Sequence, residues 1–135
     1  MTDREADLRL RIFRAFAATG APPTLGAADE APLAALADGH VVALGDDPAA
    51  PVLMAHPFAG HRAGARVDSA DRPPGTWWGN CAWDAFGIVA LLGLADATVR
   101  SGGVTLRVAD GDLLDDALFH VAVPARRWWD DIGFT

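Results

Sequence analysis

The apolar positions near the N-terminus predict an amphipathic helix. Four large apolar side chains recur there at helical spacing: Leu8, Ile12, Phe13 and Phe16. Thr2 and Glu5 have the form of a capping box, in which a hydroxyl precedes a carboxylate by three residues. Gly20 is a natural end for a helix. We therefore predict a helix over residues 3–18.

Shorter apolar segments follow and complete a small N-terminal unit. Proline and glycine predict a loop over residues 21–28, and a short helix is expected over 29–37. Two brief apolar runs, 41–44 and 51–55, are separated by turn residues and predict a β-hairpin. Helix, short helix and hairpin together outline a reduced winged-helix-like module, which we assign to residues 1–58.

The second half of the chain, residues 59–135, combines one long apolar run with strand-like segments. Asn80 is a suitable helix cap, and Asp84 is the single polar side chain among the residues that follow Cys81 as far as Leu94. A helix that is apolar on every side is typical of a buried helix. Strands are expected at 65–68, 97–100, 104–108 and 119–123, with a strand-like ending at 133–135. The predicted fold class is α+β, with a mixed α/β core after the first module.

Charge and composition exclude several classes of function. The chain of 135 residues has 11 basic and 18 acidic residues and a net charge of −7. Residues 21–60, which would form the reading elements of a winged helix, contain no arginine or lysine, so a DNA-binding regulator and nucleic-acid partners are disfavoured. No apolar run is long enough to span a membrane and no signal peptide is visible. We therefore expect a cytoplasmic protein without a membrane partner.

The single cysteine, Cys81, is the main candidate for chemistry. One cysteine excludes an intrachain disulfide and a four-cysteine zinc site. Cys81 and Asp84 stand at i and i+3, so they share a face in the first turn of the predicted helix, where the helix dipole lowers the pKa of a thiol. Such a pair suits binding of a soft metal through sulfur and proton delivery from oxygen. The alternative is an inert buried cysteine beside an aspartate that the helix dipole favours.

The histidines offer a weaker candidate site. His56 and His61 lie five residues apart, and His40 and His120 lie elsewhere in the chain. A copper or zinc site built from some of these with Cys81 is conceivable, but the spacing matches no strong ligand pattern. Polar surface histidines are the favoured interpretation.

Three segments together resemble the alkylmercury lyase (organomercurial lyase) family. They are Asn80-Cys81-Ala82-Trp83-Asp84 at the start of an apolar helix, Ala55-His56-Pro57-Phe58 upstream, and the tryptophan-rich stretch 121–132. The resemblance implies a winged-helix-like module joined to an alkylmercury-lyase-like α/β core that cleaves carbon–mercury bonds.

The resemblance also implies roles for individual groups. Cys81 binds mercury and Asp84 relays a proton, which makes both residues the catalytic and metal-binding candidates. The substrate is a small organomercurial, the mercury ion is substrate and product rather than a cofactor, and no organic cofactor is needed. External thiols remove the product. The same scaffold leaves an alternative open, a non-catalytic soft-metal (mercury or copper) binding or regulatory protein.

The sequence departs from the family pattern in its cysteine content. The family uses a second cysteine, which is expected directly after the segment that matches residues 130–135, and this chain has none. Three explanations stay open: a truncated chain, a divergent member that binds soft metals with one cysteine, or a UGA codon for selenocysteine after Thr135. Asn80 also stands where some members carry an aromatic residue.

Overall fold

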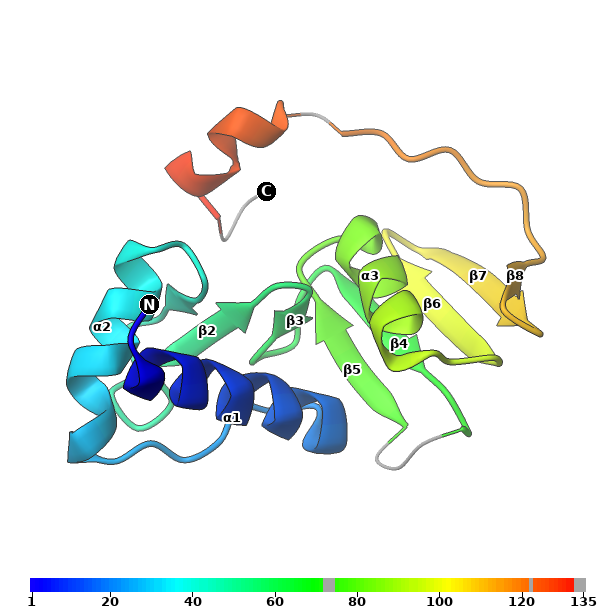
Figure 1. Cartoon of the computed structure of the whole chain (residues 1–135). Coiled ribbons are helices and arrows are strands. Elements are labelled where there is room, and N and C mark those ends of the chain that lie inside the picture. The colour runs from blue at the N-terminus through cyan, green and yellow to red at the C-terminus, as the bar shows by residue number, and fades with distance from the viewer. Residues whose placement is uncertain (72–74, 122, 133–135) are drawn as a thin grey trace.

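The computed structural model describes residues 1–71, 75–121 and 123–132, and over these it is an α+β protein with two antiparallel sheets. The first half contains two α-helices, a 3₁₀ turn and a three-stranded sheet of order β1-β2-β3 (Figure 1). These elements are α1 (Asp3–Thr19), η1 (Ala27–Asp29), α2 (Glu30–Asp38), β1 (Ala43–Leu44), β2 (Val52–Ala55) and β3 (Phe58–Ala59). The predicted helices and hairpin are confirmed, and β3 adds a strand that the sequence pattern did not indicate.

Helix α1 begins and ends where its capping residues predict. The Thr2 amide donates to Glu5 Oε2 at 2.8 Å, and the Glu5 amide donates to Thr2 Oγ1 at 3.3 Å. Gly20 adopts a left-handed conformation with φ 69°, and its N–H donates to the Phe16 carbonyl. Both ends are therefore fixed by local hydrogen bonds.

The second half is a five-stranded antiparallel sheet of order β5-β4-β6-β7-β8 with one helix packed on it (Figure 1). Its elements are β4 (Ala65–Asp68), β5 (Thr76–Gly79), α3 (Ala82–Leu92), β6 (Ala97–Ser101), β7 (Val104–Ala109), β8 (Asp112–Leu113) and the 3₁₀ segment η2 (Ala125–Asp130). Strands β4, β6 and β7 confirm three of the predicted strands. Strand β5 was not predicted; it pairs with β4 at one edge of the sheet.

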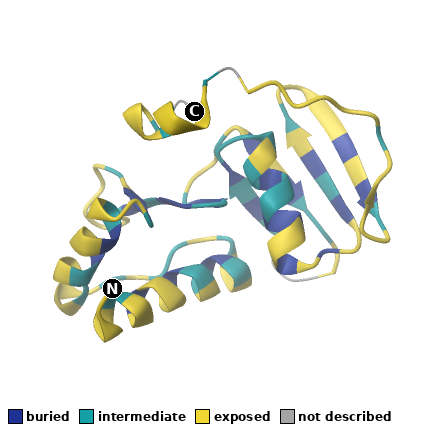
Figure 2. Ribbon diagram, turned by 45° about the horizontal axis from the view of Figure 1, so that its top comes forward, coloured by how far each residue is buried: buried dark blue, intermediate teal, exposed yellow. Residues whose placement is uncertain are grey.

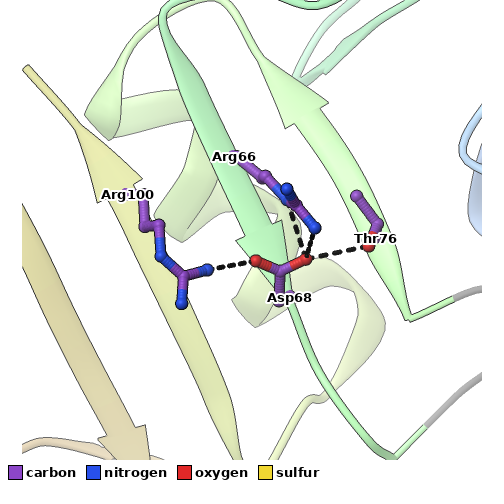
Figure 3. A network of polar contacts seen from close by, with 4 residues as sticks. All are labelled: Arg66, Asp68, Thr76 and Arg100. Carbon is purple, nitrogen blue, oxygen red and sulfur yellow. Dashed lines mark hydrogen bonds and ion pairs between the residues drawn. The ribbon is translucent and has the colours of Figure 1, made fainter.

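The two faces of this sheet differ in chemistry. Val67 and Val99 are register partners on the face that α3 covers, and both are fully buried. On the opposite face Asp68 accepts hydrogen bonds from Arg66 and Thr76, both at 2.8 Å, and forms an ion pair with Arg100 (Figure 3). This polar network joins β4, β5 and β6, which leaves the apolar face of the sheet to hold the helix.

Helix α3 corrects two predictions. It starts after Cys81, as predicted, but it is not buried on every side: Trp83 is 60% exposed and Leu91 is 59% exposed. The reason is geometric, because α3 lies on a single sheet face and only one stripe of it meets the core (Figure 2). Asn80 is also not the cap. The N-cap residue is Cys81, and the side-chain Nδ2 of Asn80 donates instead to the Ile132 carbonyl at 3.1 Å.

The predicted strand at 119–123 is wrong for its described residues. Phe119 to Val121 belong to no strand, Val123 lies in a bend, and Ala122 lies outside the described residues. After β8 the chain leaves the sheet and runs back toward the first half of the molecule (Figure 1), so its apolar residues meet no partner strand. The predicted strand-like ending at 133–135 also lies outside the described residues.

A single cluster of buried residues extends through both halves. It includes Phe16 of α1, Phe58 of β3, Trp77 of β5 and Ile88 of α3. The rings of Phe16 and Phe58 stack with centroids 5.4 Å apart, and the indole N–H of Trp77 donates to the Phe16 carbonyl at 3.1 Å. The sheet that carries α3 is therefore fixed directly to the first helix.

Within the described part of the chain, no helix combines the length and the apolar character needed to cross a bilayer.

Candidate functional site

The start of helix α3 brings the two predicted site residues together. Cys81 occupies the N-cap position in an extended conformation, with φ −139° and ψ 177°, and Asp84 lies in the first turn. The Cys81 thiol donates to Asp84 Oδ2, with sulfur and oxygen 3.6 Å apart. The Asp84 side chain is only 14% exposed. Thiol and carboxylate therefore form a direct, mostly enclosed pair.

The environment of Cys81 acts on its pKa in the direction opposite to the prediction. Burial raises the pKa of the thiol above its ordinary value, and the negative charge and side-chain hydrogen bond of Asp84 raise it further. The backbone N–H groups of Trp83 and Asp84 lower it, as expected at a helix start, but they do not prevail. The expected lowering is thus wrong because desolvation outweighs the helix N-terminus. The resting group is a protonated thiol.

A third polar side chain, His56, reaches the pair from the turn between β2 and β3. Its Nδ1 lies 3.6 Å from Asp84 Oδ1, so each carboxylate oxygen faces a different partner. Its Nε2 is buried and has no hydrogen-bond partner among the described residues. His56, whose side chain is 32% exposed, therefore contacts the site while it still lies partly at the surface.

Two glycines allow the backbone to approach the carboxylate closely. A Cβ on Gly79 of β5 would lie 2.9 Å from the Asp84 Cβ and from the Ala85 amide nitrogen. A Cβ on Gly87 of α3 would lie 3.1 Å from the Pro57 Cβ. Because neither glycine has a side chain, α3 can pack closely against both β5 and the turn that carries His56.

An apolar pocket of about 370 Å³ opens beside Cys81. One wall comes from the start of α3 and strands β6 and β7, and the other from the extended segment before η2. Its apolar lining includes Trp83, Val104, Leu106, Phe119, Val121 and Trp128. The thiol therefore borders a space suited to a small organic group.

The remaining histidines do not join the site as a metal cluster. Across residues 1–71, 75–121 and 123–132, no group of three or more histidine, cysteine, aspartate or glutamate side chains is arranged to hold a metal ion. His40 stacks on Trp129 with ring centroids 4.3 Å apart, and His120 lines the pocket. Any metal would meet the sulfur of Cys81 as its one soft ligand from the described residues.

Sequence reasoning found Cys81 and Asp84 but gave His56 no separate role. The available signal was its position inside the Ala55-His56-Pro57-Phe58 segment, which also carried the family resemblance.

Comparison with known proteins adds no relative: no family model, curated protein or solved structure matches the chain. A functional conclusion therefore depends on the chemistry of the pair and on the resemblance of its motif.

Proposed function

We propose that the protein is an alkylmercury lyase-like enzyme that cleaves carbon–mercury bonds by protonolysis. The observation that supports the proposal best is the 3.6 Å contact between the Cys81 sulfur and Asp84 Oδ2 beside an apolar pocket. A soft sulfur ligand, a proton carrier and room for an organic group are the three features that this reaction needs.

The first step transfers mercury to the protein. An organomercurial R–Hg–X enters, a bond forms between mercury and the Cys81 sulfur, and the anion X⁻ leaves. The thiol proton passes to the Asp84 carboxylate, which already accepts its hydrogen bond. A raised thiol pKa is useful here, because it keeps the proton in the site until mercury displaces it.

The second step breaks the carbon–mercury bond. The proton on Asp84 passes to the carbon of R, the bonding electron pair goes with that carbon, and the hydrocarbon R–H leaves. Mercury(II) remains on the Cys81 sulfur, and the aspartate returns to its anionic form. A thiolate from solution takes the second coordination position of mercury, supplying the ligand that the described residues do not. A second external thiol then displaces Cys81 from mercury, its proton returns to the Cys81 sulfur, and mercury(II) leaves as the complex with two external thiolates.

In this proposal the first half of the chain stabilises the second half and does not bind DNA. Its helices and three-stranded sheet would form the reduced winged-helix-like module that the sequence pattern predicts. The absence of arginine and lysine from residues 21–60 argues against a nucleic-acid surface. We therefore assign the module a structural role beside the catalytic core.

The proposal is tested by separating mercury binding from bond cleavage. The protein is incubated with phenylmercury acetate and excess thiol, and released benzene and mercury(II) are measured. Cys81→Ser should lose both binding and release. Asp84→Asn should still bind mercury at Cys81 but lose release by about a hundredfold or more, because the amide cannot relay the proton.

Asp116→Asn is the matched control, because Asp116 is an exposed aspartate outside the site. It should release benzene at the rate of the unaltered protein. Benzene release that survives Cys81→Ser would reject the mechanism. Stoichiometric mercury binding without benzene release would identify the alternative, a non-catalytic soft-metal binding protein.

A further inference from the structure

We propose that His56 is a positioning residue that holds Asp84 in the orientation needed for proton transfer. The role of Asp84 as a proton carrier rests on the proposed function. The role of His56 rests on its position beside the Asp84 carboxylate. His56 would bind one carboxylate oxygen through its Nδ1–H and leave the other oxygen directed at the Cys81 thiol.

The carboxylate lies between two partners from different parts of the fold. Oδ2 accepts from the Cys81 sulfur, which belongs to the same helical turn, whereas Oδ1 lies 3.6 Å from His56 Nδ1 in the β2–β3 turn. The second separation is longer than an ordinary hydrogen bond. Contacts of this kind commonly shorten when substrate binds.

The surroundings of the imidazole determine which nitrogen carries its proton. A neutral histidine has one N–H donor and one acceptor nitrogen. A proton on Nε2 would be a buried N–H without an acceptor among the described residues, whereas a proton on Nδ1 faces a carboxylate oxygen. The Nδ1–H tautomer is therefore the one that suits this environment.

The imidazole packs against one aromatic ring, and the residue that follows it is packed closely against α3. Trp129 of η2 packs edge-on against His56 with centroids 5.9 Å apart and stacks on His40. Gly87 lets α3 approach Pro57, the residue that follows His56. An imidazole packed in this way can restrict the carboxylate, as partners of a ligand or catalytic group commonly do.

The first test observes the tautomer and needs no enzymatic activity. Nitrogen-15 NMR of histidine-labelled protein, at a pH about two units above the ordinary histidine pKa of about 6.5, distinguishes Nδ1–H from Nε2–H. His56→Asn identifies the His56 signal by its loss. We expect the Nδ1–H form, lost in Asp84→Ala and kept in Asp116→Ala. An Nε2–H form, or a tautomer that Asp84→Ala leaves unchanged, overturns the proposal.

The second test measures the effect on cleavage of phenylmercury. His56→Ala should lower kcat about 10- to 100-fold while KM stays within about threefold, since mercury still binds to Cys81. His56→Asn, whose amide N–H can reach the same oxygen, should recover most of the rate. An unchanged kcat in His56→Ala, or no recovery in His56→Asn, contradicts the positioning role. If the unaltered protein releases no benzene, the proposed function fails, and the tautomer measurement alone decides on His56.

Discussion

Among single residues, the proposed chemistry depends most on the thiol of Cys81. Its sulfur contacts Asp84 Oδ2, and burial together with the aspartate charge holds the pKa of the thiol above its ordinary value. A helix start alone would act in the other direction. Desolvation is the larger of the two effects, so the protonated form of the thiol is favoured.

This competition predicts how Cys81 reacts with iodoacetamide as pH rises. Because the thiolate is the reactive form, the midpoint of the alkylation rate should lie above the ordinary thiol pKa of about 8.5. Asp84→Asn should move the midpoint to lower pH, since it removes a negative charge and a hydrogen bond that favour the protonated thiol. Asp116→Asn should leave it in place. A midpoint below the ordinary value, or one insensitive to Asp84→Asn, would contradict this description of the thiol.

At the scale of elements, the site depends on how closely the first turn of α3 approaches its neighbours. Gly79 of β5 has no side chain where Asp84 and Ala85 pack against the strand. Any Cβ at this position would meet backbone atoms that belong to the start of the helix. Glycine at this position therefore lets the strand and the start of the helix pack this closely without displacement.

Gly79→Ala should consequently lower the free energy of unfolding by about 1–3 kcal/mol, because the added methyl group overpacks a buried contact. Gly26→Ala is the control, since a Cβ at Gly26 meets nothing within 4 Å, and it should change stability by less than about 0.5 kcal/mol. Urea unfolding measures both variants. Equal stability of Gly79→Ala and the unaltered protein would show that α3 does not depend on this close approach.

Elements with local signals could be predicted from sequence, and elements defined by long-range packing could not. Helix α1 has its periodicity and caps within its own residues, so its bounds were predicted almost to the residue. The apolar run of α3 predicted a helix but not which side faces the sheet, and hence not the exposure of Trp83. The apolar residues at 119–123 resembled a strand, yet a strand forms only where a partner strand is available.

The candidate site also combines residues that local sequence predicts with a residue that only the fold brings close. Cys81 and Asp84 were predictable because their spacing places them on one face of one helical turn. His56 lies in the segment 55–58 that carries the family resemblance, but it approaches Asp84 from a different element, so its spacing along the chain did not reveal this contact. The raised pKa of Cys81 was also unpredictable, since it arises from burial by distant residues.

At the scale of the whole molecule, one buried cluster connects the first helix with the sheet that carries the site. Trp77 is fully buried in β5, and its indole N–H donates to the Phe16 carbonyl in α1. Phe16 in turn stacks on Phe58. Because these contacts join both halves through the core, we expect the described parts of the chain to unfold together.

Trp77→Phe should lower the free energy of unfolding by about 1–3 kcal/mol through a lost hydrogen bond and reduced packing. Trp83→Phe, at an exposed position on α3, should change it by less than about 0.5 kcal/mol. Far- and near-ultraviolet circular dichroism should follow the same urea transition in the unaltered protein. Two separate transitions would mean that the cluster does not couple the two halves.

The amount of hydrocarbon that one chain releases from an organomercurial tests the proposed carbon–mercury cleavage. With phenylmercury acetate and excess thiol, we expect benzene release faster than in a thiol-only blank, continuing beyond one benzene per chain. In D₂O each benzene should carry one deuterium, because the new carbon–hydrogen bond takes its proton from the exchangeable Cys81–Asp84 pair. Benzene release no faster than in the thiol-only blank would contradict carbon–mercury cleavage by this protein.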